Sequence, residues 1–105
     1  MRMSGDISFD DLYEMITDEK TYIILEMLKD GERSSEDMIK EAEIFYKTFN
    51  YIVSRMYKAG MVDSRTTLRT RFYLINKAGL QELAIKLNGI SENLNSAADK
   101  LSTYC

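Results

Sequence analysis

Hydrophobic and polar positions repeat with the period of an α-helix from Ser8 to Lys58, which predicts four helices in a row. The four segments span about 8–16, 18–30, 35–42 and 45–59. The expected N-caps are Ser8, Thr17 or Asp18, and Ser34 or Ser35. Gly31 and Gly60 follow the second and fourth helices, where glycine commonly ends a helix. Apolar residues lie on several sides of the second helix, so we expect it to be central.

The fourth helix is predicted to have one apolar and one polar face. Its apolar side collects Phe45, Phe49, Ile52, Val53 and Met56. Its outer side presents Lys47, Asn50, Tyr51, Ser54 and Lys58, with Arg55 on the flank. Cationic, amide and hydroxyl groups of this kind can bond base edges or phosphates. An ordinary amphipathic helix with a mixed polar face explains the same pattern, so the helix alone does not decide its role.

After Gly60 the hydrophobic pattern alternates, which predicts a β-hairpin instead of a helix. The two strands are MVDSRT and RTRFYLI, joined by a short turn near Thr67-Leu68-Arg69. On the second strand Arg71, Tyr73 and Ile75 share one face. Asn76 is expected to cap a further helix that begins at Lys77.

The C-terminal stretch carries an apolar seam with alternating spacings of three and four residues. The seam consists of Leu80, Leu83, Leu87, Ile90, Leu94, Ala97, Leu101 and Tyr104. This spacing is typical of a coiled coil and predicts one long helix that pairs with a second chain through Leu83 to Tyr104. From Leu80 to Leu87 the seam can instead pack onto the protein's own core. Gly89 is a poor helix former at which the helix can bend, and no charge pattern sets parallel or antiparallel pairing.

Charge is unevenly distributed along this chain of net charge −3. Residues 1–44 hold 5 basic and 13 acidic residues, whereas residues 45–77 hold 7 basic residues and one acidic residue. Three of the basic residues are Arg65, Arg69 and Arg71, in or beside the predicted hairpin. A basic block within an acidic chain suits a polyanionic partner, although a solvated face without a partner gives the same count.

Composition excludes several classes of function. The chain has no histidine and one cysteine, Cys105, which leaves no internal disulfide and no Cys/His metal site. It also lacks a nucleophile motif and a glycine-rich phosphate loop, so we expect neither an enzyme nor a cofactor. No segment approaches the ~20 apolar residues of a membrane span, and the N-terminus has no apolar signal core. These features predict an intracellular protein.

Three motifs in order resemble winged helix-turn-helix transcription regulators of the MarR, PadR and ArsR kind. They are EKTYIILEMLKDG at 19–31, RMYKAGMV at 55–62 and FYLINKAGLQEL at 72–83. RMYKAGMV is similar to the end of a recognition helix, R-L-x-x-A-G-L-V, and FYLINKAGLQEL is similar to Y-x-L-T-x-K-G-x-E-L, which follows the wing. The predicted C-terminal coiled coil also resembles that of small archaeal winged-helix proteins. Gly79 stands one place later than the commonest pattern, and the Cys and His ligands of metal-sensing ArsR proteins are absent.

The resemblance implies a mostly α-helical fold with a small β-hairpin: a winged helix over 1–79 and a dimerisation helix over 80–105. It implies a cytoplasmic, nucleoid-associated homodimer that binds double-stranded DNA as a repressor-like regulator, and it names no effector. The fourth helix would enter the major groove through Lys47, Asn50, Tyr51 and Ser54, with Arg55 and Lys58 nearby. Arg65, Arg69 and Arg71 would lie on the wing. Two alternatives stay open: Arg71 can pair with Asp63, and the fold can serve as a protein-interaction module in a transcription or chromatin assembly.

Overall fold

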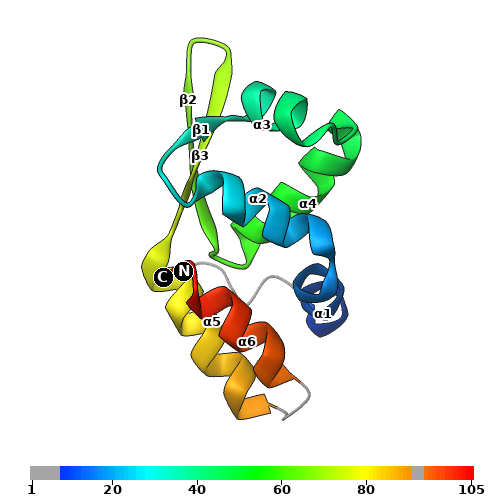
Figure 1. The fold of residues 1–105 in the computed structure, drawn as a ribbon, viewed down its shortest axis with the longest axis vertical. Helices are drawn as coiled ribbons and strands as arrows, with labels where there is room; N and C mark the ends of the chain where they lie inside the picture. The colour runs from blue at the N-terminus through cyan, green and yellow to red at the C-terminus, as the bar shows by residue number, and fades with distance from the viewer. Residues whose placement is uncertain (1–7, 91–93) are drawn as a thin grey trace.

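A computed structural model describes residues 8–90 and 94–105 of the chain (Figure 1). The elements, in order, are α1 (Phe9–Thr17), α2 (Glu19–Leu28), β1 (Arg33–Ser34), α3 (Ser35–Ala42), α4 (Tyr46–Lys58), β2 (Val62–Thr67), β3 (Thr70–Ile75), α5 (Lys77–Ile90) and α6 (Asn95–Ser102). The β2–β3 hairpin projects at one end of the molecule and the α5–α6 pair lies at the other. None of the described helices is long and apolar enough to cross a membrane.

Short polar side chains begin four of the helices, and sequence analysis anticipated each of them. Their bonds are Ser8 Oγ to Asp11 N–H (3.1 Å), Asp18 Oδ1 to Lys20 N–H (2.9 Å), Ser34 Oγ to Asp37 N–H (3.1 Å) and Asn76 Oδ1 to Gly79 N–H (2.9 Å). Each satisfies a backbone N–H that has no partner within its helix. Helix α4 is different, because its N-cap is Phe45 and no side chain caps it. The helix-turn-helix connection is tight: α3 ends at Ala42 and Glu43 takes a left-handed conformation.

The sheet has three antiparallel strands in the order β1-β3-β2. In the hairpin Val62 pairs with Ile75 and Thr67 with Thr70, so the turn is the two residues Leu68-Arg69. Strand β1 was not predicted, because its two residues are too short to show any alternation. It pairs with Tyr73 and Phe72 and so fixes the hairpin beside the start of α3.

The core is formed between α2 and α4 and continues under the sheet and α5. Ile24 and Leu25 of α2 are fully buried, which confirms the central position expected for this helix. Phe49 of α4 is also fully buried, and its ring meets Tyr73 of β3 edge-on at 6.2 Å. This contact sets the position of the hairpin relative to α4, and therefore the geometry of the surface that the two elements share.

The C-terminal seam belongs to two helices and not to the single long helix predicted. Helix α5 ends at Ile90, and α6 begins at Asn95 and lies beside α5 (Figure 1). Leu83, Leu87, Leu94 and Leu101 are buried within the chain, and Ala97 and Tyr104 pack partly buried against the same core. The side chain of Ile90 lies outside the described residues. A coiled-coil partner could not reach these buried leucines in this conformation.

The physical reason is that a heptad seam specifies a partner helix but not the chain that supplies it. Folding back lets α6 cover α5 without a second molecule. The sequence holds one signal for this outcome, since Asn88 and Gly89 come between two apolar stretches and disfavour a continuous helix. The division into residues 1–79 and 80–105 stays a prediction, although the buried seam residues join one hydrophobic core with those of α2 and α4.

Candidate nucleic-acid interface

The two faces predicted for α4 are present. Lys47, Asn50, Tyr51, Ser54 and Lys58 are exposed, whereas Phe49, Ile52, Val53 and Met56 are buried. Phe45 was expected in the core but is 63% exposed, because it precedes the first helical turn instead of facing inward from it. It lies against the exposed ring of Tyr46, with ring centroids 5.2 Å apart.

The hairpin, which we call the wing (residues 62–75), carries two arginines that have no ion-pair partner among the described residues. Arg69 and Arg71 are exposed, and neither forms an ion pair with any residue in the described ranges. The alternative pairing of Arg71 with Asp63 is wrong. The register places Arg71 opposite Thr66, and Asp63 Oδ1 accepts a hydrogen bond from Asn76 Nδ2 at 3.3 Å.

Arg65 is held by the protein itself. Its Nε and Nη2 atoms each donate to a different carboxylate oxygen of Glu32 at 2.7 Å, and its guanidinium lies 4.6 Å from the centroid of the Phe72 ring. The hydrogen bond from Arg65 is the main cause that lowers the pKa of Glu32, so the pair stays ionised below the usual carboxylate range. Arg65 is therefore compensated and is not among the free cations of the wing.

Arg55 likewise contacts other protein groups instead of facing outward. Its guanidinium donates to Glu14 Oε1 at 2.5 Å and to Asp11 Oδ1 at 2.9 Å, and it lies 4.1 Å from the centroid of the Tyr51 ring. The bond to Glu14 is the main cause that raises the pKa of Arg55. Only 17% of this side chain is exposed. Arg55 therefore joins α4 to α1, and these contacts engage the guanidinium that was predicted to lie near DNA.

We expect Arg55→Gln to lower the free energy of unfolding by about 1–2 kcal/mol, since it removes two ion pairs and a cation–π contact from a mostly buried side chain. Urea denaturation measures the change. Lys58→Gln is the matched control on the same helix, and we expect it to stay within about 0.5 kcal/mol of the unmodified chain. Equal stability of the two variants would contradict the assignment of Arg55.

A polar pocket of about 570 Å³ lies where α3, α4 and the wing meet. Its walls are Ser35 of α3, Asn50, Ser54 and Tyr57 of α4, and Ser64, Arg71 and Tyr73 of the wing. The prediction from the sequence includes Asn50, Ser54 and Arg71 in the candidate site. It missed the other four, although the alternating pattern had put Tyr73 on the same strand face as Arg71. The missing link was the distance between elements, which no local pattern gives.

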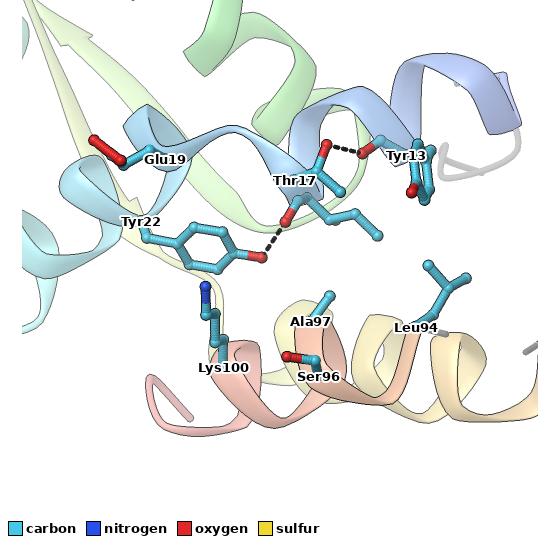
Figure 2. A pocket seen from close by; sticks show the side chains of 9 residues that line it. Tyr13, Thr17, Glu19, Tyr22, Leu94, Ser96, Ala97 and Lys100 are labelled. Carbon is cyan, nitrogen blue, oxygen red and sulfur yellow. Dashed lines mark hydrogen bonds between the residues drawn. The ribbon is translucent and has the colours of Figure 1, made fainter. Parts of the chain in front are cut away.

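A second cavity, of about 410 Å³, lies between α1, α2 and α6, away from the wing (Figures 1 and 2). Figure 2 shows the Tyr22 ring between α2 and α6 with Lys100 beside it, 5.0 Å from the ring centroid. The Tyr22 hydroxyl donates to the Ile16 carbonyl, and burial raises the pKa of Tyr22 to about 12. The Thr17 hydroxyl donates to the Tyr13 carbonyl at 2.8 Å. These groups already have partners, so the surface of α4 and the wing is the better candidate site.

Comparison with known proteins supports the fold. Neither the models of known protein families nor the sequences of curated proteins match the chain. Among solved structures, HlyU from Vibrio cholerae N16961 is similar with a TM-score of 0.59 and 19% sequence identity, over 89% of this chain and 86% of that one. The chain therefore has a winged-helix fold, in which α3 and α4 form the helix-turn-helix and β2–β3 forms the wing. At this identity the likeness establishes the fold alone.

Proposed function

We propose that the chain binds double-stranded DNA as a transcription regulator, with α4 in the major groove and the wing on the adjoining backbone. The observation that carries the proposal is that α4 and the wing together present four exposed cations without ion-pair partners among the described residues: Lys47, Lys58, Arg69 and Arg71. Two lie on the outer face of α4 and two on the wing. The two cations that would not serve DNA, Arg55 and Arg65, are neutralised by acidic partners.

Sequence reading is proposed for the outer face of α4. The Asn50 amide can bond adenine through two hydrogen bonds, and Lys47 can reach guanine or a phosphate. Tyr51 and Ser54 add a ring and a hydroxyl on the same exposed face. The cations of the wing would bond phosphates, which fixes position without reading sequence. This division of roles is a proposal for a specific regulator.

Selection of bound duplexes from a random pool tests the function most broadly. A specific regulator enriches one sequence, whereas recovery of unselected sequences would show a general DNA binder, and recovery of no DNA would contradict the proposal. The same selection also tests whether the protein binds as a homodimer. The homodimer remains a proposal, and its interface would have to be a surface other than the buried seam. A two-fold dimer would enrich paired half-sites about 10 bp apart or a multiple of that.

Glu32→Gln should strengthen DNA binding, because it frees the Arg65 guanidinium on the wing. We expect affinity to rise several-fold at low salt and the log–log salt dependence to steepen by about one unit, as one more cation meets a phosphate. Fluorescence anisotropy at several salt concentrations measures both. Glu36→Gln, an exposed residue that gives the same charge change on α3, is the control. Equal effects from the two variants would show a general charge effect and contradict a specific restraint of Arg65.

A protein-interaction module is the alternative function, and one observation favours it. The exposed aromatic pair Phe45–Tyr46 lies at the start of α4 beside the acidic residues Glu41 and Glu43. Exposed aromatic side chains are common anchors at protein interfaces. Under this alternative Arg69 and Arg71 would meet an acidic protein, and DNA affinity would be insensitive to them.

The proposal includes neither an enzyme activity nor a cofactor, and it places the protein in the cytoplasm at the nucleoid. In the part of the chain that the structure describes, no three Asp, Glu or Cys side chains are grouped to hold a metal ion. The proposal names no small-molecule effector.

A further inference from the structure

Tyr73 is the one wall of the pocket between α4 and the wing that is almost entirely buried. Only 6% of the residue is exposed, and its ring packs on Phe49. Its hydroxyl forms no hydrogen bond with any residue of the described ranges. The described chain has no fully buried side-chain oxygen that lacks a partner, so this hydroxyl must keep some access to solvent. Tyr73 is one of the residues that line the pocket, so the pocket is the space that this hydroxyl can reach.

An unused hydroxyl on a buried residue is unusual, since phenol groups usually find a hydrogen-bond partner when they are buried. Because the hydroxyl keeps access to solvent, it can bond water when no ligand is present. A ligand that accepts a hydrogen bond from Tyr73 would take the place of that water. The hydroxyl is therefore a hydrogen-bond donor that no described residue uses and that is available to a ligand in the pocket.

The other walls specify the charge of that acceptor. Arg71 supplies a guanidinium with no ion-pair partner in the described chain, and Asn50 supplies an amide. Ser54 and Ser64 add hydroxyls from opposite walls, one on α4 and one on β2. Among the described residues no carboxylate lines the pocket. One fixed cation surrounded by hydrogen-bond donors is suited to an anion with several acceptor oxygens.

We propose that this pocket is a phosphate-binding site in which Arg71 and the Tyr73 hydroxyl hold one backbone phosphate of the bound DNA strand. The inference rests on the proposed function and deepens it, because it assigns one contact to named atoms. A guanidinium fork matches two phosphate oxygens, and the phenol bonds one of them. The volume of about 570 Å³ is more than a phosphate alone needs, which suits a group that is part of a passing strand. A phosphate held here would fix α4 and the wing on the same strand.

The test combines single-residue and single-phosphate changes. Tyr73→Phe removes the hydroxyl and keeps the ring that packs on Phe49, and Arg71→Lys keeps the charge but loses the fork. Each is titrated with the selected duplex and with copies that carry one uncharged methylphosphonate linkage at each position in turn. Tyr13→Phe on α1 is the control, because this exposed tyrosine lies outside the pocket.

We expect Tyr73→Phe to weaken binding of the unmodified duplex about 10-fold, as for a hydrogen bond to a charged group, and Tyr13→Phe to leave it unchanged. At one position per bound chain, the methylphosphonate linkage should weaken binding of the unmodified protein by a similar factor. The same linkage should have little further effect on binding by Tyr73→Phe. Arg71→Lys should lose affinity at that same linkage. Such coupling identifies the phosphate that occupies the pocket.

Other outcomes separate this inference from the proposed function. If the protein binds DNA and Tyr73→Phe binds every duplex as tightly as the unmodified chain, the phosphate site is overturned and the function stands. If no duplex binds, the function fails, and inorganic phosphate and AMP are then titrated by NMR. Shifts at Arg71 and Tyr73 that Tyr73→Phe abolishes would support the site with a free phosphate as its ligand. Absence of shifts would overturn it.

Discussion

Charge reversal at Arg69 and Arg71 is expected to reduce DNA affinity about 100-fold or more at low salt. The double variant Arg69→Glu/Arg71→Glu removes both free cations of the wing and replaces them with carboxylates that repel phosphate. Hydrogen bonds to charged groups contribute about 1.5–3 kcal/mol each, so two of them account for about 3 kcal/mol or more. Arg69 and Arg71 are exposed and take no part in the core, so the fold should be unaffected.

Anisotropy titration of one labelled duplex measures this loss. The matched control is Lys20→Glu/Lys77→Glu, which makes the same change in net charge at exposed positions at the starts of α2 and α5. We expect the control to lose only a few-fold in affinity, because its charges lie outside the proposed contact. Unchanged affinity in the wing variant would contradict DNA binding through the wing and favour the protein-interaction module.

Gly79→Ala is expected to destabilise the fold more than any other substitution proposed for this chain. A Cβ at Gly79 would lie 1.8 Å from the Gly60 carbonyl oxygen and 2.9 Å from the carbonyl carbon. Both atoms are backbone, in the link between α4 and β2, so no side-chain rotation can relieve the clash. We expect a loss of about 3 kcal/mol or more in unfolding free energy, at the upper end of the cost of overpacking. For a chain of this size the melting temperature should fall by more than about 10 °C.

Gly89→Ala is the matched control for this prediction. Gly89 is also in α5, but a Cβ there would meet no atom of the described residues within 4 Å. Its replacement should stabilise the helix by up to about 1 kcal/mol. Thermal unfolding followed by circular dichroism compares the two. If Gly79→Ala melts as high as Gly89→Ala, the close approach of α5 to the link before the wing is wrong.

Features that depend on neighbouring residues could be predicted from the sequence. The N-caps at Ser8 and Asn76, the two faces of α4 and the strand alternation after Gly60 all depend on residues a few positions apart. For this reason the winged-helix architecture and the exposed side of α4 agree with the structure. Only the first turn of α4 differed, where Phe45 lies outside the helix and is exposed.

Features that depend on distant residues could not be predicted in this way. Arg65 pairs with Glu32 across 33 positions, and Arg55 pairs with Asp11 across 44. Both arginines had the same sequence signature as the free cations, and only the folded arrangement separates them. The prediction of one long helix from the C-terminal seam was wrong for a related reason, because the spacing of the seam fits a partner helix from the same chain as well as one from a second chain.

This separation changes the expected electrostatics of the complex. The basic block of residues 45–77 holds 7 cations, but α4 and the wing present only four without an ion-pair partner in the described ranges, Lys47, Lys58, Arg69 and Arg71. If each of the four cations contacts one phosphate, each bound chain releases about four counterions from the DNA. The acidic residues in the first part of the chain would be expected to stay away from DNA.

The salt dependence of DNA binding tests the central claim most directly. Anisotropy titrations over a range of salt concentrations give the association constant at each concentration. We predict that its logarithm falls with the logarithm of the salt concentration with a slope of about −3 to −4 per bound chain. That value corresponds to four phosphate contacts from Lys47, Lys58, Arg69 and Arg71. A slope near zero, or no binding at the lowest salt concentration, would contradict the proposal that α4 and the wing form a DNA-binding surface.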